Sequence, residues 1–542
     1  MDADGSSLDD ASHSALKPDA FDADLFIDMP ALGASYVGTM PGGGSSVLEK
    51  NLDAIRTSCA RTAQLIEQAA PRTDIIFIET DDVCPDSGEP VLSATIGTGD
   101  ETRALSSKRR PLAEAQKLAD GFDIKENGAA AVLGFGLGHH AKAIARVVQK
   151  MGVVLCFEPD VALLRAVFER IDHSQWMADT NFAIFTDPAD PGLISARLKG
   201  FEPTVSLGTR IIHHTPSRPR LGKTAAEFSD NLMRVLRAIR TNLVTTLLQV
   251  EVTQRNLLQN LDHYTNAPGI TDLKDCCKGK PAIVVSAGPS LARNIHLLKQ
   301  PGIRERFVIV AAQTVLRQLL AEGIKPHFVT ALDYHEISKR FYEGLTEDDV
   351  RGVTLIAEAK ANPAILDAFP GQIRVPDDKY LTAVLGEDLF TARGQLTPGA
   401  TVAHLACYVA RHMGCDPVIL VGQDLGFTDG QYYGAGAAIH RVWSGELNAF
   451  NTLEMMEWQR IVRGRATLHK VTDTLGRPVF SDEQMLTYLT QFERDFLADA
   501  DRGLTVIDAT EGGVAKQHTR TMPLADAINK YTPADRLSIP TA

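Results

Sequence analysis

A glycine-containing turn follows an apolar run near the middle of the chain. The run PAIVV leads into a turn with four candidate nucleotide-binding residues, Ser286, Gly288, Pro289 and Ser290. Glycine lets the backbone approach a ligand closely, proline presets φ for a turn, and serine can cap a helix or donate to a phosphate. A helical pattern follows, and a helix N-terminus suits an anion. The segment 281–333 therefore predicts a nucleotide-phosphate site, although an ordinary strand–turn–helix has the same pattern.

Polar residues also follow three later apolar runs, in the segments AAQT, ALDYHE and LVGQDLGF. They are Gln313, Thr314, Asp333, His335, Gln423 and Asp424. Ligands of open parallel sheets lie at the carboxyl ends of the strands, so we expect these side chains to converge on the Gly288 turn. Asp333 and Asp424 could bind ribose hydroxyls, hold Mg²⁺ or act as a base. Each aspartate alone is more typical of a turn or a helix cap, whereas three strand ends together predict a site.

The segment YYGAGAAIH, residues 432–440, contains two glycines and a histidine. His440 could act as a general base, and a flexible loop at this place could close over the site. A surface loop with a solvated histidine fits the same residues equally well.

A second glycine-containing turn, LGFGLGHH, stands between a predicted strand and a predicted helix. Its glycines are Gly134, Gly136 and Gly138, and Glu158 ends the next predicted strand. This context is typical of a dinucleotide site, and it also fits an adenosine site of the methyltransferase type. A structural role, in which the glycines only permit tight packing, fits the same residues. The histidine and cysteine spacings fit no metal site, so none is expected.

Alternating apolar runs and helical patterns predict an α/β protein with two Rossmann-like, doubly wound parallel sheets joined by a long helix. We divide the chain into a disordered acidic tail (1–26), a first Rossmann-like domain (27–226), an unbroken linking helix (227–265), a nucleotide-binding domain (266–431) and a mixed, mostly helical C-terminal region closing the site (432–542).

The bulk composition excludes several classes of protein. The net charge of -13 argues against a general nucleic-acid-binding surface, which needs a basic face. No apolar run reaches the ~20 residues of a membrane span. Seven cysteines without a disulfide-type framework fit a reducing cytoplasm, where we expect the protein to be located.

The segments PAIVVSAGPSL, FVIVAAQT and GIKPHFVTALD resemble the hydroxymethylpterin diphosphokinase (MptE-like) domain. Other segments resemble, in the same order, the motility-associated factor glycosyltransferases: LGFGLGHH with FEPD, GATVAHLACYVARHMGCDPVILVGQDLGFTDG, SDEQMLTYLTQFERDF and VIDATEGG. That resemblance implies transfer of a nonulosonic, sialic-acid-like sugar from a CMP-sugar to a protein Ser or Thr hydroxyl, with flagellin as a possible acceptor.

The same resemblance implies positions for the donor. It puts Gly288, Pro289 and Ser290 around the nucleotide, and Asp333, Gln423 and Asp424 at the donor rim. The CMP-sugar is then a substrate, and no tightly bound cofactor is expected. His440, His335 and Asp424 all remain candidates for the base.

Two other functions remain open. One is an MptE-like diphosphokinase that transfers diphosphate from ATP to a hydroxymethylpterin, with Mg²⁺ held by Asp333 and Asp424. The other is a non-catalytic module of a surface-glycosylation pathway.

Overall fold

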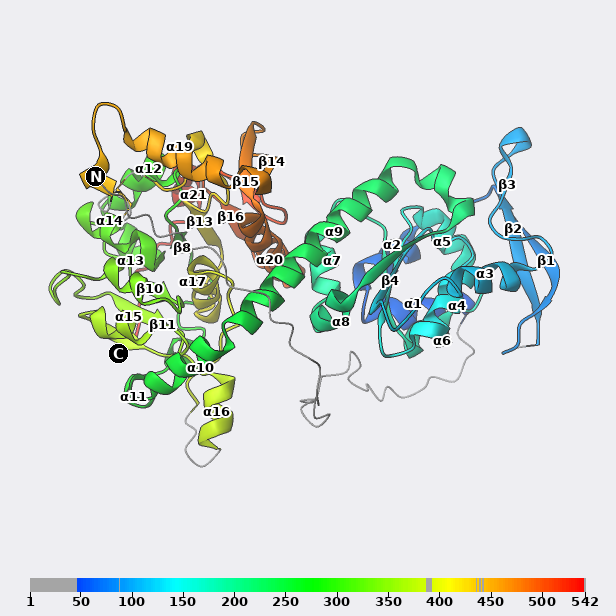
Figure 1. Ribbon diagram of the computed structural model, residues 1–542, viewed down its shortest axis with the longest axis horizontal. Coiled ribbons are helices and arrows are strands. Elements are labelled where there is room, and N and C mark those ends of the chain that lie inside the picture. Colours follow the sequence, from blue (N-terminus) through cyan, green and yellow to red (C-terminus); the bar gives the residue numbers. More distant parts are fainter. Residues whose placement is uncertain are drawn as a thin grey trace, which may run out of the picture. The chain divides into compact units, whose positions relative to one another are not determined.

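The computed structural model describes residues 46–540, apart from Ser87 and residues 387–391, 435, 438, 439, 441 and 442 (Figure 1). The tail predicted at 1–26 lies outside the described residues. The predicted fold class is confirmed, because two parallel sheets flanked by helices are joined by a helical segment.

The first parallel sheet has four strands in the order β6-β5-β4-β7. They are β4 (Ala129–Leu133), β5 (Val153–Phe157), β6 (Asn181–Phe185) and β7 (Thr209–His213). Its central strands read AAAVL and VVLCF and are fully buried, as strands covered on both faces require. The helices of this part are α1 (Val47–Arg56), α2 (Ala60–Gln68), α3 (Pro111–Ala119), α4 (His139–Val148), α5 (Val161–Phe168), α6 (Ser174–Asp179), α7 (Pro191–Arg197) and α8 (Glu202–Leu207).

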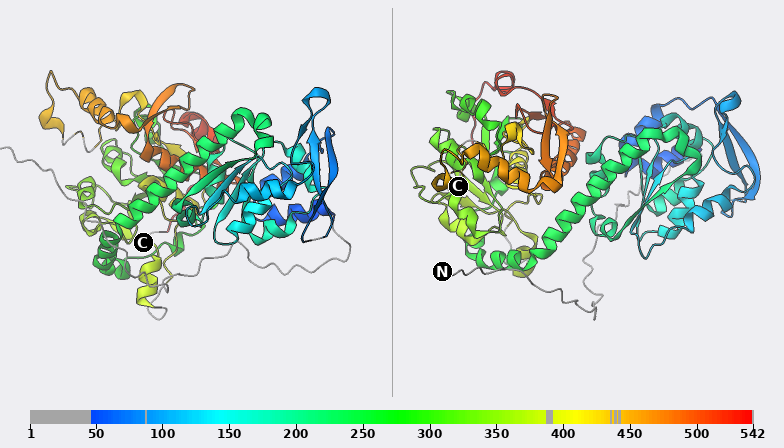
Figure 2. Two further views of the ribbon diagram at one scale, coloured as in Figure 1. Left: turned by 45° about the vertical axis from the view of Figure 1, so that its right-hand side comes forward. Right: turned by 45° about the horizontal axis from the view of Figure 1, so that its top comes forward.

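A small antiparallel sheet precedes β4 in the chain. Its strands are β1 (Ile75–Val83), β2 (Pro90–Ile96) and β3 (Arg103–Ala104). Figure 2 shows this sheet in blue from two further directions, and helix α3 contacts β1 and β2.

The second parallel sheet has eight strands in the order β12-β11-β10-β9-β8-β13-β16-β17. They are β8 (Ala282–Val285), β9 (Val308–Ala312), β10 (Phe328–Ala331), β11 (Thr354–Ala357), β12 (Gln372–Arg374), β13 (Val418–Val421), β16 (Val506–Asp508) and β17 (Arg520–Thr521). Strands β16 and β17 come from the region 432–542, so that region contributes strands to this sheet as well as helices.

Alternate residues of β8 point to opposite faces of this sheet. Ala282 and Val284 pack in the cluster that includes α17 (Val402–His412) and α20 (Glu483–Asp501). Ile283 and Val285 pack in the cluster on the other face. The remaining helices and the hairpin are α12 (Leu291–Asn294), α13 (Ile303–Arg306), α14 (Leu316–Ala321), α15 (Pro363–Ala368), α16 (Lys379–Leu385), α19 (Leu453–Arg463), α21 (Leu524–Tyr531), β14 (Leu468–Thr472) and β15 (Pro478–Asp482).

The linking segment differs from the single helix that the sequence predicts. It starts earlier and is divided into α9 (Arg218–Leu248), α10 (Val250–Gln259) and α11 (Leu261–Asn266), and α9 itself is kinked at Gly222, whose φ and ψ are not helical. The buried amide of Asn260 donates to the carbonyl oxygens of Ala359 (2.7 Å) and Ala361 (2.6 Å). These contacts hold the break between α10 and α11, and the apolar periodicity of the sequence does not reveal them.

Strand order reverses once in each parallel sheet. In the second sheet β9 to β12 extend to one side of β8, whereas β13, β16 and β17 extend to the other. In the first sheet the reversal lies between β4 and β7. Loops leave such a pair of strands in opposite directions, so a crevice forms at the carboxyl ends of the strands. Each of the two glycine-containing turns follows the strand at a reversal.

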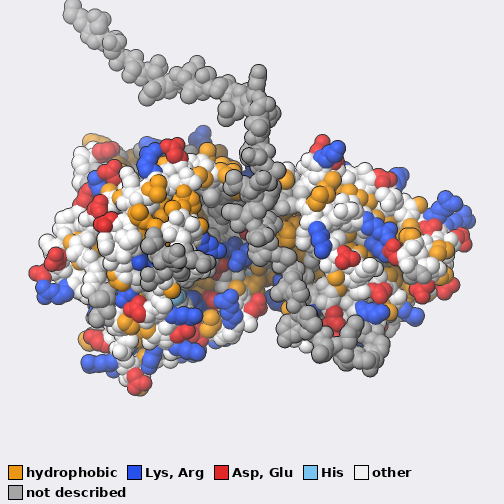
Figure 3. Space-filling view, turned by 90° about the horizontal axis from the view of Figure 1, so that it is seen from below, with side chains coloured by type: hydrophobic (Ala, Val, Ile, Leu, Met, Phe, Trp, Pro, Cys, Tyr) orange, Lys and Arg blue, Asp and Glu red, His pale blue; other side chains and the backbone are white. Residues whose placement is uncertain are grey.

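The surface shown in Figure 3 carries interspersed acidic and basic side chains. Over the described residues, no helix is long and apolar enough to cross a membrane.

Candidate nucleotide-binding site

The Gly288 turn packs directly against the loop that follows β13. The backbone N–H of Gly288 donates to the Gly422 carbonyl oxygen over 2.9 Å. A Cβ at position 288 would lie 2.1 Å from Asp424 Oδ1 and 2.5 Å from Gly422 O. The glycine therefore allows two loops to approach each other closely, whereas the sequence pattern predicts close approach of the backbone to a ligand.

Four of the predicted residues form two hydrogen-bonded pairs at this reversal. Ser290 donates its N–H to Asp424 Oδ2 (3.1 Å) and its hydroxyl to Asp424 Oδ1 (2.5 Å). Ser286 donates its hydroxyl to Gln423 Oε1 (2.6 Å). These residues, which are predicted from the sequence, thus meet in space although they are more than 130 positions apart.

Asp424 lies beneath the turn and is 3% exposed. Burial raises the pKa of its carboxyl, and the hydrogen bonds from Ser290 act in the opposite direction. Both carboxylate oxygens already accept hydrogen bonds from Ser290. The geometry therefore makes Asp424 a clamp between the two loops.

The helix after the turn is shorter than the sequence suggests. Helix α12 has four residues and continues as a 3₁₀-helix over Ile295–Lys299. The N–H of Leu291 donates to Gly288 O (3.1 Å), and that of Arg293 to Ser290 O (2.9 Å). Fewer free N–H groups and a smaller dipole are available here than at a regular helix N-terminus.

A second group of predicted residues lies at the ends of β9 and β10. Gln313 Nε2 donates to the carboxylate of Asp333, and Ser338 donates its hydroxyl to Asp333 Oδ2 over 2.9 Å. The buried Tyr342 hydroxyl donates to Gln313 Oε1 (3.1 Å). Thr314 is half-buried next to Gln313. These residues bond to one another, and the strand order places them one and two strands from β8.

His335 follows this group but is exposed. Its ring lies against the ring of Tyr334, with 4.1 Å between the ring centroids. The hydrogen bonds and ion pairs of the described residues include none that holds His335 near the Gly288 turn.

His440 is brought to the site by the segment after Gly430. Gly434 donates its N–H to the Ala287 carbonyl oxygen (3.2 Å), next to the Gly288 turn. His440 Nε2 lies 2.6 Å from Glu457 Oε1. Glu457, on α19, also accepts the N–H of Tyr432 (2.7 Å) through Oε2. Glu457 could not be predicted from the sequence, because no local motif links it to a histidine 17 positions away.

A third loop closes the site from the C-terminal side. Gly513 lies against Asp424, since a Cβ at position 513 would be 2.4 Å from Asp424 Cα. Val514 donates its N–H to Asp424 O (2.7 Å). Arg293 donates to Glu511 O and to Asp429 Oδ2, each over 2.5 Å. Arg293 therefore ties together the loops after β8, β13 and β16.

Asp333 and Asp424 do not form a joint metal-binding pair. Asp333 bonds to Gln313 and Ser338, whereas Asp424 bonds to Ser290. In the part of the chain that the structure describes, no group of three or more His, Cys, Asp or Glu side chains is placed to hold a metal ion. The two carboxylates therefore belong to separate hydrogen-bonded groups.

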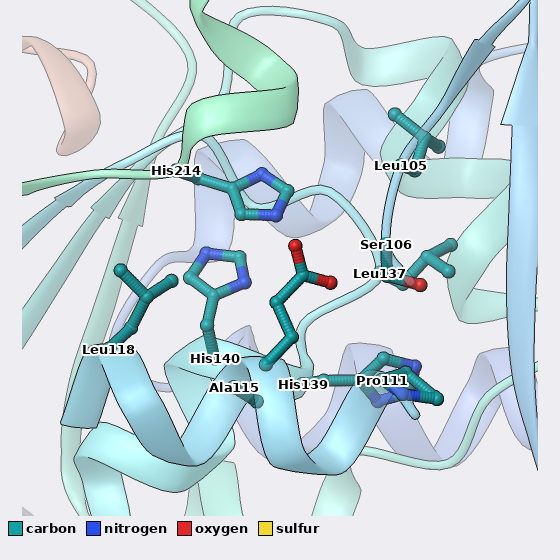
Figure 4. A pocket seen from close by; sticks show the side chains of 10 residues that line it. Leu105, Ser106, Pro111, Ala115, Leu118, Leu137, His139, His140 and His214 are labelled. Atoms are coloured by element: carbon teal, nitrogen blue, oxygen red, sulfur yellow. The ribbon is translucent and has the colours of Figure 1, made fainter. Parts of the chain in front are cut away.

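The first glycine-containing turn is filled by side chains of the protein itself. A Cβ at Gly134 would lie 2.4 Å from Ser217 Cβ, one at Gly136 would lie 2.5 Å from His214 Cε1, and one at Gly138 would lie 2.6 Å from His173 Cε1. The His140 and His214 rings stack at 3.9 Å (Figure 4). The cavity beside them has a volume of about 10 Å³, room for about one water molecule.

Glu158 is also occupied. Its carboxylate is 0% exposed and accepts from Arg220 NH1 (2.5 Å), Arg220 NH2 (2.6 Å) and the Phe135 N–H (3.1 Å). A ribose hydroxyl would have to displace the guanidinium of Arg220. The geometry of this turn thus favours the structural role over nucleotide binding.

Part of the chain is similar to known proteins. Residues 255–430 match the family model described as 6-hydroxymethylpterin diphosphokinase MptE-like. No curated protein matches the chain. A solved structure of an MAf glycosyltransferase from Magnetospirillum magneticum AMB-1 aligns over 88% of this chain and 74% of that chain, with 16% identity and a TM-score of 0.47. The resemblance to the MptE-like domain is confirmed, and the chain contains such a domain at residues 255–430.

Proposed function

We propose that this protein is a cytoplasmic glycosyltransferase of the motility-associated factor type. It transfers a nonulosonic, sialic-acid-like sugar from a CMP-sugar to a Ser or Thr hydroxyl of an acceptor protein, with flagellin as the first candidate. The ordered motifs between residues 130 and 513 and the MptE-like domain support this proposal.

One observation carries the proposal. The Gly288 turn stands where the strand order reverses between β8 and β13, and a histidine-bearing loop is hydrogen-bonded to it through Gly434 and Ala287. Nucleotides bind at such reversals in open parallel sheets. The strand ends supply the hydroxyl of Thr314 and the group around Asp333 as further contacts for the donor.

The reaction then depends mainly on placement and on charge stabilisation. The acceptor oxygen forms a bond to the anomeric carbon of the sugar, and the bond from that carbon to the phosphate oxygen breaks. CMP leaves with the electron pair of the broken bond, and a base takes the proton of the acceptor hydroxyl.

Binding of CMP tests the nucleotide site directly. Gly288 is unsuitable for substitution because any side chain there would collide with Asp424. Thr314→Glu puts a negative charge at the strand end, and we expect calorimetry to show CMP binding to the native protein that weakens at least about tenfold in the variant. Thr253→Glu, at a half-buried threonine on α10, is the matched control and should bind normally. A native protein that does not bind CMP would refute the proposal.

The diphosphokinase remains the second candidate because the matching family model carries that description. It predicts tight binding of ATP with Mg²⁺ and no response to CMP. A native protein that binds CMP but shows no transfer to any acceptor would instead indicate a non-catalytic module.

A further inference from the structure

We infer that Glu457 is a positioning residue that holds His440 with its Nδ1 atom free to accept the proton of the acceptor hydroxyl. This inference rests on the proposed function and adds the identity of the base and of the residue that orients it.

The contact with Glu457 fixes the tautomer of His440. Its Nε2 atom lies 2.6 Å from Glu457 Oε1. A carboxylate can only accept, so Nε2 must carry the hydrogen atom. In the neutral ring the other nitrogen, Nδ1, is then an acceptor. Nδ1 is buried and has no hydrogen-bond partner among the described residues. A buried acceptor without a partner is costly, and in our proposal the acceptor hydroxyl supplies that partner and gives up its proton to Nδ1.

The carboxylate of Glu457 is buried beside His440. Glu457 is 2% exposed, and within the described residues its ionic partner is His440, itself 11% exposed. A buried carboxylate is costly unless it is paired and hydrogen-bonded. When His440 takes a proton, the new positive charge lies beside this carboxylate, which stabilises it as the aspartate does in the serine protease triad.

Helix α19 also contacts the start of the loop that carries His440. The second oxygen of Glu457 accepts the N–H of Tyr432, which anchors the start of the loop. Arg460, one turn further along α19, lies over the rings of Tyr432 (4.7 Å) and Tyr433 (5.5 Å). Helix α19 therefore holds both the histidine and the loop that carries it.

Backbone hydrogen bonds connect His440 to the turn proposed to bind the donor. Gly434 donates to Ala287 O, Ala437 donates its N–H to Gly434 O (3.2 Å), and His440 donates its N–H to Ala437 O (3.0 Å). A series of three backbone hydrogen bonds thus leads from Ala287 to the histidine. The other candidate bases fit less well, because Asp424 has both oxygens bonded to Ser290 and His335 is exposed without an acidic partner in the described part of the chain.

Glu457→Gln preserves shape and removes the charge. We expect kcat to fall about 10²- to 10⁴-fold with little change in CMP binding, because the donor site is intact. Glu454→Gln, at an exposed glutamate one turn earlier on the same helix, is the matched control and should leave kcat unchanged.

The tautomer provides a readout independent of turnover. Long-range ¹H–¹⁵N spectra of ¹⁵N-histidine-labelled native protein should show His440 protonated at Nε2, with its signals assigned by their loss in His440→Gln. In Glu457→Gln the Nε2-protonated form should no longer predominate. A native His440 protonated at Nδ1, or a Glu457→Gln protein with native kcat, would overturn the inference. A native protein that fails to bind CMP would refute the proposed function, while the spectra would still decide the role of Glu457.

Discussion

Ser290 donates both its backbone N–H and its hydroxyl to the carboxylate of Asp424, over 3.1 Å and 2.5 Å. This contact joins the loops that follow β8 and β13, the two strands at which the strand order reverses. The candidate site is therefore built on a buried polar clamp. Its stability depends on a close fit between the two loops and on the charge of one carboxyl group.

Gly288→Ala should destabilise the protein severely. Its Cβ would lie 2.1 Å from Asp424 Oδ1 and 2.5 Å from a backbone oxygen, so the clamp has to move. We expect a loss of about 3 kcal/mol or more in the free energy of unfolding, measured by denaturant titration. Gly445→Ala is the control, since its Cβ would meet no atom within 4 Å and its φ is not left-handed. Equal stability of the two variants would contradict the close approach.

Asp424→Asn should change how stability depends on pH. Burial raises the pKa of Asp424 in the folded protein above its ordinary value of 3.8. The folded state then binds the proton more tightly than the unfolded state, so this group lowers stability as the pH rises from about 4. As the pH rises from about 4, the asparagine variant should therefore become more stable relative to the native protein. Asp230→Asn, at an exposed position on α9, should give no such gain. The prediction is refuted if the unfolding free energy of Asp424→Asn plotted against pH runs parallel to that of the native protein.

We expect the first Rossmann-like part to be less stable in the Arg220→Met variant. It removes the guanidinium that is paired with the buried Glu158 carboxylate and leaves that charge uncompensated. Breaking a buried ion pair in this way costs about 3–5 kcal/mol. The control is Arg255→Met, which removes an exposed pair with Glu251 and should cost under about 1 kcal/mol. The double variant Arg220→Met, Glu158→Gln should recover part of the loss, and thermal unfolding would measure all three.

His140 should make the protein sensitive to mild acid. Burial lowers its pKa from 6.5 to about 4 in the folded state. The unfolded state therefore takes up the proton first, and stability is lost as the pH falls from about 6.5 towards 4. A shift of this size corresponds to about 3 kcal/mol. His140→Gln should flatten the curve of unfolding free energy against pH in this window, whereas His335→Gln, at an exposed ring, should not. Identical slopes in the native protein and His140→Gln would count against this explanation.

The layout of the sheets could be predicted from the sequence because strands buried on both faces are continuous apolar runs. PAIVV and DPVILV are examples, and both end at the reversal where Ser286 and Gln423 meet. The convergence of Ser290 with Asp424 followed from a general property of parallel sheets, without any knowledge of distances. Local pattern and a topological rule were sufficient for these features.

Other features depend on contacts that no local pattern encodes. Glu457 and His440 meet because α19 packs on the preceding loop. No sequence motif contains both residues. His214 fills the turn at Gly136, so a glycine pattern typical of nucleotide binding became a packing site. The break at Asn260 likewise depends on carbonyl oxygens about 100 positions away.

Strand β16 and the loop after it have a consequence for biosynthesis. Gly513 and Val514 contact Asp424, and Arg293 reaches the Glu511 carbonyl oxygen. During translation the β8 and β13 loops leave the ribosome long before these partners do. The site can thus be completed only after residues 506–514 emerge, and a nascent chain that already carries the Gly288 turn is still without the loop that closes it.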